Sequence, residues 1–373
     1  MLKRLIMPNQ KHPHKKSLHE IDGISQPDYI NQNSIQNIQK FRRKPLDTDA
    51  LIQKLLQGDI PSLSKAITLI ESTNPQHQEQ AHKIIQSCLL YANKSVRIGI
   101  TGVPGVGKST FIEAFGMYLT SIGKKVAVLA IDPSSSISRG SILGDKTRME
   151  DLVKNENAFI RPSASGESLG GVSRKTRESI ILCEACGFDT ILIETVGVGQ
   201  SETAVHSMTD FFLLLNLAGA GDELQGIKRG IMEMADAIVI NKADGDNMDR
   251  ARNAKLDANR GLQLFPMKES QWKPRVLLAS AYYRTGIAEV WQLLENYFSL
   301  TKENGYFENN RNNQNAYWLK ETINEQLLLN FYQNNTIAQA LTEEEKAVQN
   351  NEKSPFAAAS ELLQLYAKLN SKL

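Results

Sequence analysis

One glycine-rich segment, GVPGVGKST at residues 102 to 110, constrains the fold of this chain more strongly than any other feature. It fits the pattern G-x-x-x-x-G-K-[ST], with Gly102, Gly107, Lys108 and Ser109 at the fixed positions. An apolar run, VRIGIT, precedes it, and the helix-forming run FIEAFGMYLTSIG follows. Glycine lets successive backbone N–H groups turn toward anionic oxygens, and the positive end of the following helix points to the same place. The segment therefore predicts a strand, a phosphate-binding loop and a helix in succession.

Five further apolar runs have the character of buried strands: KVAVLAID, DTILIET, DFFLLLNLA, DAIVINKAD and RVLLASA. They show no polar alternation, and segments of helical length separate them, which is typical of a parallel sheet covered on both faces. Such sheets bind ligands at the carboxyl ends of their strands. We therefore predict an α/β P-loop fold with a mostly parallel, doubly wound sheet.

Helical segments flank this sheet in the sequence. Residues 1–45 lack the apolar density of a core and are interpreted as a disordered, flexible leader, whereas residues 46–95 have helical periodicity and predict an N-terminal helical domain. The sheet-forming domain is expected over residues 96–300. Residues 301–373 form amphipathic helices that are either a further part of the fold or a dimerisation arm, because a helical hairpin has little core of its own to cover it.

Composition excludes several partners. The 43 basic and 41 acidic residues give a formal charge of +2, so we expect no nucleic-acid partner. The longest apolar run is far shorter than the roughly 20 residues of a membrane helix, so we expect no membrane span. Three cysteines are too few for a disulfide scaffold and suit a reducing compartment. We predict a bacterial cytoplasmic protein; the basic residues 1–19 loosely resemble a transit peptide, so the mitochondrial matrix is the location expected of a eukaryotic chain.

The residue types of the glycine-rich loop predict how it would hold a nucleotide. Lys108 is expected to contact the β- and γ-phosphates, and the hydroxyl of Ser109 is expected to ligate Mg²⁺. A chance glycine turn is disfavoured because the loop lies between a strand and a helix. The predicted phosphate-binding residues are Gly102, Val103, Pro104, Gly105, Val106, Gly107, Lys108, Ser109 and Thr110.

The base is predicted by the tetrapeptide NKAD at residues 241 to 244, which ends an apolar strand. The carboxylate of Asp244 can accept two hydrogen bonds from guanine, whereas adenine would leave it buried and unpaired. Lys242 would pack along the base, and Asn241 would tie this loop to the phosphate loop. Backbone donors of the segment ASA, at residues 279 to 281, would reach the guanine oxygen. The predicted base-binding residues are Asn241, Lys242, Asp244, Ser280, Ala281 and Tyr282, and the predicted ligand is GTP rather than ATP.

Hydrolysis also needs carboxylates that order a metal ion and a water. Glu194 is assigned to the Walker B position, with Gly197 donating to the γ-phosphate, and Asp132 and Asp145 are assigned to Mg²⁺ or to the water. The motif reads ETVG where common small GTPases have D-x-x-G, which points to another branch of the class. The predicted catalytic residues are Lys108, Asp132, Asp145, Glu194 and Gly197, and the predicted metal ligands are Ser109, Asp132, Asp145 and Glu194.

An unusual loop, GAGDELQGIKRG at residues 219 to 230, follows the most apolar run of the chain. Asp222 or Glu223 could cap the helix that follows, because the helix dipole favours an acid there. Capping does not explain the glycines at 219, 221 and 226. Flexible backbone that carries fixed charges is typical of a switch, which pairs those charges in one nucleotide state and releases them in the other.

The segments GVPGVGKST, IDPSSS, GSILGDKTRM, FDTILIETVGVGQSE, GAGDELQGIKRGIMEMAD and NKAD, in this order, closely resemble the MeaB/ArgK family of P-loop GTPases, to which the methylmalonic aciduria type A proteins belong. The resemblance covers about residues 46–373. It implies a GTP-hydrolysing chaperone that gates adenosylcobalamin delivery to an acyl-CoA mutase, usually methylmalonyl-CoA mutase, and protects it. It further implies a homodimer joined by the C-terminal helices, cobalamin bound only by the mutase, and a third switch with Asp222, Glu223, Gln225 and Lys228.

Alternatives remain at this point. The sequence departs from the family at Arg139 and at CEAC, where Cys183 and Cys186 stand in place of alanines. A C-x-x-C pair is also known from nickel-delivery GTPases, although small buried residues before a helix-ending glycine are better explained by packing. A kinase or ATPase of an amino-acid transport system and a GTP-binding module with negligible turnover are the other candidates. The sequence does not identify which acyl-CoA mutase would be the partner.

Overall fold

The computed structural model describes residues 47–72, 74–131, 149–162, 169–195, 201–218 and 229–370. Its contacts divide the chain into two units, residues 1–47 and 48–373. The predicted leader, residues 1–45, lies outside the described residues, and the predicted domain boundaries at residues 95 and 300 stay predictions.

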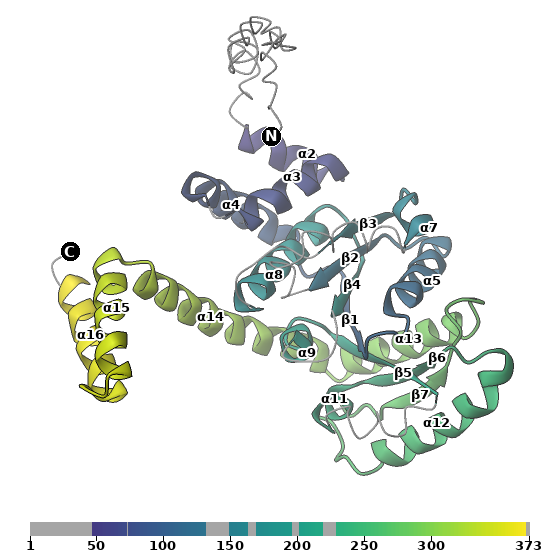
Figure 1. Ribbon diagram of the computed structural model, residues 1–373. Helices are drawn as coiled ribbons and strands as arrows, with labels where there is room; N and C mark the ends of the chain where they lie inside the picture. The colour runs from purple at the N-terminus through teal and green to yellow at the C-terminus, as the bar shows by residue number, and fades with distance from the viewer. Residues whose placement is uncertain are drawn as a thin grey trace, which may run out of the picture. The chain divides into compact units, whose positions relative to one another are not determined.

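A sheet of seven strands occupies the centre of the second unit (Figure 1). Its order is β3-β2-β4-β1-β5-β6-β7, and every strand pairing is parallel. The strands are β1 (Val96–Gly102), β2 (Val126–Ile131), β3 (Ala158–Arg161), β4 (Thr190–Thr195), β5 (Phe211–Leu217), β6 (Ala237–Asn241) and β7 (Arg275–Leu278). The α/β fold with a doubly wound sheet, predicted as mostly parallel, is thus confirmed.

The edge strand β3 was not predicted. Only Phe159 of its four residues is buried, because the strand has a neighbour on one side only and lies at the rim of the core. Pro162 follows it directly. A four-residue run with one buried side chain and a proline after it carries too little apolar periodicity to be recognised.

Helices cover both faces of the sheet, so each strand buries alternate side chains in two separate cores. Val126 and Val128 of β2 enter one core, and Ala127 and Leu129 of the same strand enter the other. This explains the strands' lack of polar alternation. The covering helices are α5 (Lys108–Ser121), α7 (Glu150–Val153) and α13 (Ile287–Glu303) on one face, and α8 (Leu169–Ala185), α9 (Ser201–His206), α11 (Arg229–Met234) and α12 (Met248–Leu262) on the other.

Three helices at the amino-terminal side extend the second of these cores. They are α2 (Thr48–Leu56), α3 (Ile60–Glu71) and α4 (Pro75–Cys88), followed by the 3₁₀ turn η1 (Leu89–Tyr91). Their buried leucines and isoleucines belong to the same apolar cluster as α8. Lys175 of α8 donates to the carbonyl of Glu71 at 2.8 Å, and Glu71 pairs with Arg161. The helices therefore pack on α8 through both apolar and polar contacts.

The chain ends in three helices, α14 (Tyr306–Tyr332), α15 (Asn335–Gln349) and α16 (Pro355–Asn370). The first half of α14 is anchored, because Arg311, Gln314 and Trp318 are buried. Trp318 donates to the carbonyl of Ser207 at 3.1 Å. The second half of α14 instead exposes large apolar side chains. None of the described helices combines the length and the apolar character that crossing a bilayer would require.

Candidate nucleotide-binding site

The phosphate loop connects β1 to α5, and two of its glycines are required by close contacts. Gly107 has φ +91°, and a Cβ there would lie 2.9 Å from the Asn241 side-chain nitrogen. A Cβ on Gly102 would lie 2.5 Å from the carbonyl oxygen of Leu215, on the neighbouring strand β5. Any larger residue would push the loop away from these neighbours. The glycine pattern of the sequence thus reflects close packing as well as backbone freedom.

Lys108 lies over this loop. Its ammonium group donates to the carbonyl of Gly102 at 2.9 Å and to that of Val103 at 3.4 Å. Burial lowers the pKa of Lys108, while the nearby carboxylates of Glu194 and Glu202 act in the opposite direction. The ammonium group is therefore held at the centre of the loop, where the predicted contact to the β- and γ-phosphates would be made.

Ser109 and Glu194 come together from two elements. The Ser109 hydroxyl donates to Glu194 Oε1 at 3.2 Å, and Glu194 lies near the end of β4, which pairs with β1. Glu194 is only 5% exposed. A hydroxyl and a carboxylate are oxygen ligands of the kind that Mg²⁺ prefers. The two predicted metal ligands that fall within the described residues are thus adjacent and fit a Mg²⁺ site chemically.

Several predicted functional residues lie outside the described residues. They are Asp132, Asp145, Gly197, Asp222, Glu223, Gln225 and Lys228. Their assigned roles stay predictions.

Asn241 joins the base-binding loop to the phosphate loop, as the sequence predicts. Its side-chain nitrogen donates to the carbonyl of Val106 at 2.8 Å, and its side-chain oxygen accepts from the backbone N–H of Ala281 at 3.2 Å. It is 1% exposed, so both bonds are shielded from water. Lys242 adds a third link, because its ammonium group donates to the carbonyl of Gly105 at 2.9 Å. The loops after β1, β6 and β7 are thereby held as one unit.

Asp244 is oriented by a side chain for which the sequence predicted a different role. The Ser280 hydroxyl donates to Asp244 Oδ2, and Ser280 is fully buried. The backbone N–H of Ser280 donates to the carbonyl of Thr285 at 3.0 Å. That bond and the one from Ala281 to Asn241 compete with the predicted donation to guanine, which stays a prediction. Tyr282 is largely exposed and meets Tyr283 edge to face at 4.9 Å between ring centroids.

One buried acid near the phosphate loop was missed. Glu202 is 1% exposed at the start of α9, and its charge acts on the pKa of Lys108 together with that of Glu194. It ends the segment ETVGVGQSE, in which only Glu194 and Gly197 received a role. An acid that closes a glycine-rich stretch after a sheet strand is a signal that could have identified it.

The cysteine pair lies in the interior rather than at a surface. Cys183 and Cys186 are buried, and α8 ends at Ala185 before Gly187, which has φ +96°. Burial raises the pKa of Cys186 to about 11, so the thiol rather than the metal-binding thiolate is favoured. Within the described residues, no three histidines, cysteines or acids form a group suited to a metal ion. These observations favour packing over nickel delivery.

Comparisons with known proteins agree with this geometry. The family profile described as methylmalonyl Co-A mutase-associated GTPase MeaB matches residues 63–336. A probable GTPase of Mycobacterium tuberculosis is 47% identical over 317 residues, which cover 85% of this chain and 94% of that protein. The Escherichia coli GTPase ArgK is 45% identical over 311 residues, covering 83% and 94% of the two chains. The mitochondrial methylmalonic aciduria type A homolog of Mus musculus is 43% identical over 328 residues, covering 85% and 79%.

A solved structure extends the likeness to three dimensions. The crystal structure of an LAO/AO transport system kinase is similar with a TM-score of 0.69 and 37% sequence identity. The similarity covers 87% of this chain and 100% of that chain. It therefore includes the sheet and many of the surrounding helices.

Proposed function

The chain belongs to the MeaB family of GTPases, and on that premise we propose that it is the GTP-dependent chaperone of an adenosylcobalamin-dependent acyl-CoA mutase, with methylmalonyl-CoA mutase as the first candidate. The chain itself binds and hydrolyses GTP. In the proposed role, GTP hydrolysis times the delivery of adenosylcobalamin to the mutase and protects it from inactivation. Cobalamin is bound by the mutase and not by this chain. The observation that carries the proposal is the match of residues 63–336 to a family described as mutase-associated.

The chemistry of hydrolysis would be divided among the residues of the phosphate loop and β4. Ser109 and Glu194 would hold Mg²⁺, which supplies positive charge against the phosphate oxygens when it is bound. Lys108 would orient the β- and γ-phosphates from the position where it now donates to loop carbonyls. Asp132, Asp145 and Gly197 complete the proposed set as metal, water and γ-phosphate contacts.

Residues 219 to 228 are proposed as a third switch, because β5 leads into them from beside the phosphate loop. Leu215 of β5 pairs with Gly102, the first residue of that loop, and β5 ends at Leu217. The segment therefore begins only a few residues along the chain from the strand residue that pairs with the phosphate loop. Asp222 and Lys228 are the proposed link to the mutase, with Glu223 and Gln225 in the same switch.

Replacing Asp222 or Lys228 with alanine tests the switch. Each change should leave GTP affinity nearly intact and weaken the stimulation of hydrolysis by the mutase. Fluorescence titration with a labelled GTP analogue gives the affinity, and a phosphate-release assay gives the stimulation. Unchanged stimulation in both variants would contradict the proposed link.

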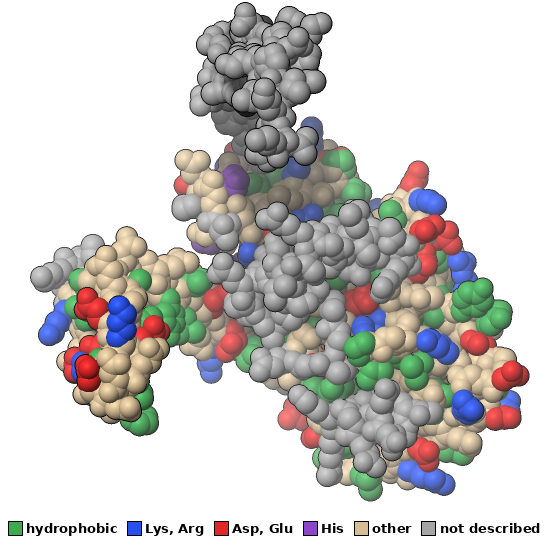
Figure 2. Space-filling view, in the orientation of Figure 1, with side chains coloured by type: hydrophobic (Ala, Val, Ile, Leu, Met, Phe, Trp, Pro, Cys, Tyr) green, Lys and Arg blue, Asp and Glu red, His purple; other side chains and the backbone are tan. Residues whose placement is uncertain are grey.

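The C-terminal helices are proposed as a homodimer interface. Leu319, Ile323 and Leu327 of α14 are 64%, 49% and 56% exposed and recur every four residues, so they form one apolar row. Phe356 and Leu363 of α16 are also exposed. Figure 2 shows hydrophobic side chains interspersed with charged ones on the surface of these helices. Contiguous exposed apolar side chains mark interaction surfaces, and a second copy of the chain is the occupant proposed here.

Sedimentation velocity of the wild type and of Leu327→Ser tests the dimer. The variant should dissociate at protein concentrations at which the wild type is dimeric. Leu264→Ser is the control, because Leu264 is also solvent-exposed, at 75%, but lies after α12. A wild-type chain that stays monomeric at all accessible concentrations would refute the interface.

A transport-system kinase or ATPase is the second candidate, because the similar solved structure is that of an LAO/AO transport system kinase. The arrangement of Asp244, oriented by Ser280 and tied through Asn241 to the phosphate loop, favours guanine over adenine. This geometry supports the GTPase over an ATP-dependent kinase.

Hydrolysis of GTP and of ATP, each with and without purified acyl-CoA mutase, tests the proposed function. The mutases to be compared act on methylmalonyl-, isobutyryl- and ethylmalonyl-CoA. We expect preference for GTP and acceleration by one of the three, which identifies the partner. Preference for ATP, or GTP hydrolysis that none of the mutases changes, would overturn the chaperone proposal.

A further inference from the structure

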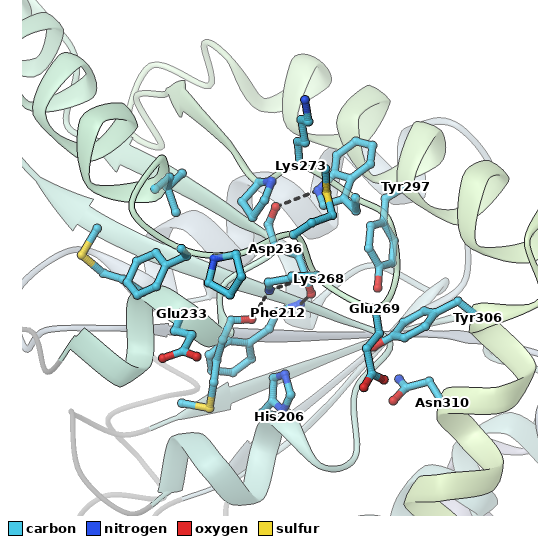
Figure 3. A pocket seen from close by; sticks show the side chains of 18 of the residues that line it. His206, Phe212, Glu233, Asp236, Lys268, Glu269, Lys273, Tyr297, Tyr306 and Asn310 are labelled. Carbon is cyan, nitrogen blue, oxygen red and sulfur yellow. Dashed lines mark hydrogen bonds and ion pairs between the residues drawn. The ribbon is translucent and has the colours of Figure 1, made fainter.

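A cavity of about 980 Å³ opens at the amino-terminal ends of the strands, on the side of the sheet opposite the phosphate loop. Thr209 and Asp210, which precede β5, Asp236, which precedes β6, and Pro274, which precedes β7, all line it. The phosphate loop instead follows the carboxyl end of β1. We call this space the amino-edge cavity (Figure 3). Its volume is that of a typical site for a small organic ligand.

Several apolar side chains line the amino-edge cavity. Met232 and Met234 come from α11, Leu262 from the end of α12, and Phe265 and Met267 from the segment that follows α12. Methionine side chains are flexible and adapt to the shape of an apolar ligand. The walls therefore suit a ligand with a hydrocarbon body.

The charges around the amino-edge cavity are unequal. Among the described lining residues, four carboxylates stand against two ammonium groups. Lys268 is committed to the protein, because its ammonium group donates to the carbonyls of Met234 and Ala235 at 2.7 and 2.8 Å and to Asp236 Oδ1 at 2.8 Å. These three bonds use all of its hydrogens. The Lys273 side chain points away from the labelled carboxylates in Figure 3.

Two of the four carboxylates are likewise committed. Asp236 pairs with Lys268, and Asp210 pairs with Arg311 of α14 at 2.6 Å. The remaining two, Glu233 and Glu269, are exposed and lie on opposite sides of the His206 ring in Figure 3. The committed groups balance one another, so the net charge that faces a ligand comes from Glu233 and Glu269.

The other titratable groups of the walls stay neutral near pH 7. The protein that surrounds the His206 ring lowers the pKa of this residue, since the charged imidazolium is disfavoured there. Burial and the nearby carboxylates of Asp236 and Glu269 raise the pKa of Tyr306 to about 12. His206 therefore adds no positive charge, and Tyr306 keeps a hydroxyl hydrogen that can be donated.

We propose that the amino-edge cavity binds a small organic cation, whose hydrocarbon body packs on Met232, Met234 and Leu262 and whose ammonium or guanidinium groups pair with Glu233 and Glu269. Charge-assisted hydrogen bonds of this kind are about twice as strong as neutral ones. A ligand with a negative charge, such as a phosphate ester, meets the same two carboxylates and is excluded. The site is separate from the nucleotide site and does not depend on the mutase.

A series of probes with one chain length and different charges tests this proposal. The probes are hexamethylenediamine, hexylamine, hexanol and adipate, which carry two, one and no positive charges and two negative charges, respectively. Ligand-observed NMR titration of the full chain without nucleotide gives the affinity of each. We expect binding to weaken from hexamethylenediamine to hexylamine to hexanol, with no binding of adipate.

Two variants and a matched control assign the binding to this cavity. Glu233→Gln and Glu269→Gln each keep the shape of the side chain and remove its charge, and each should weaken hexamethylenediamine binding about tenfold. Glu295→Gln is the control, because Glu295 is an exposed acid of α13 that does not line the cavity. It should leave the affinity unchanged.

Three results would overturn the proposal. They are no binding of hexamethylenediamine in the millimolar range, binding of hexanol or adipate as strong as that of the diamine, or equal affinities in the two cavity variants and the control. Because Glu233 and Glu269 are exposed side chains, we expect all variants to fold, and circular dichroism with a thermal scan checks this. Since GTP hydrolysis is not the readout, failure here leaves the proposed chaperone function untouched, and the converse also holds.

Discussion

Polar residues have different roles at the carboxyl-terminal and the amino-terminal ends of the strands, which we call the carboxyl edge and the amino edge of the sheet. At the carboxyl edge, Lys108, Asn241 and Lys242 donate to the carbonyls of the phosphate loop, so the polar groups shape a site for a ligand. At the amino edge, Arg311 and Asp210 form a buried ion pair that fastens α14 to the start of β5. The polar groups at the carboxyl edge therefore shape the proposed ligand site, whereas the buried ion pair at the amino edge stabilises the fold. The amino-edge cavity lies beside this ion pair.

The ion pair at the amino edge is part of an extensive hydrogen-bond network. Besides the carboxylate of Asp210, the Arg311 guanidinium donates to the carbonyls of Asn93 and Ser95 at 3.0 and 2.6 Å. Glu184 of α8 accepts from the Ser95 hydroxyl at 2.6 Å and pairs with Arg97 at 3.0 Å. One network thus joins α8, β1, β5 and α14. All members are hydrogen-bonded, which is the condition under which buried charges are tolerated.

The largest effect is expected on stability at the amino edge. Arg311→Met leaves Asp210 as a buried charge without its main partner, and the free energy of unfolding should fall by about 3 to 5 kcal/mol. Denaturant unfolding measures this loss. Arg284→Met is the matched control, because the Arg284 pair with Asp151 is exposed at 56% and 57% and should contribute less than about 1 kcal/mol. Equal losses in the two variants would show that the buried network does not fasten α14.

The second effect is expected on activity at the carboxyl edge. Lys108→Ala removes the ammonium group from the centre of the phosphate loop, and GTP hydrolysis should fall about 100-fold, as when other preorganised charge contacts are removed. The unfolding free energy should change little, because Lys108 is only partly buried. Single-turnover hydrolysis and denaturant unfolding of the same sample separate the two quantities. Hydrolysis within a few-fold of the wild type would contradict the proposed role of Lys108.

The two edges also differ in what the sequence could predict. The carboxyl edge was predicted from short segments, because the glycine-rich loop and NKAD each bring their residues together within a few positions of the chain. The amino-edge cavity was not predicted, since its residues come from α9, α11, the segment after α12, α13 and α14. No local pattern marks a site that only the folded chain assembles.

The same reasoning accounts for two smaller features that were not predicted. The start of α14 at Tyr306 could not be predicted, because its polar first turns are held by Arg311 and Gln314 rather than by an apolar stripe. The Ser280 hydroxyl, which received no role, orients Asp244 across 36 positions of the chain. Such long-range side-chain contacts carry no sequence signal of their own.

A smaller effect is expected from the Ser280 hydroxyl at the carboxyl edge. Ser280→Ala removes the hydroxyl that donates to Asp244 Oδ2 and accepts from the backbone N–H of Tyr283 at 3.3 Å. Asp244 would keep its charge but lose its fixed orientation, so GTP affinity should fall by about 1 kcal/mol, or roughly fivefold. Discrimination against ATP should fall by a similar factor, because the oriented carboxylate is what would recognise guanine.

Competition between GTP and ATP for a fluorescent GDP analogue measures both quantities in the Ser280 variant. Thr285→Val serves as the control. Thr285 bonds to Ser280 through its backbone, which the change keeps, whereas the side chain that orients Asp244 is that of Ser280. If Ser280→Ala weakens GTP and ATP equally, the hydroxyl holds the loop rather than the base-reading carboxylate. Ser280 would then belong with the structural residues, and the predicted recognition of the base would rest on Asn241, Lys242 and Asp244.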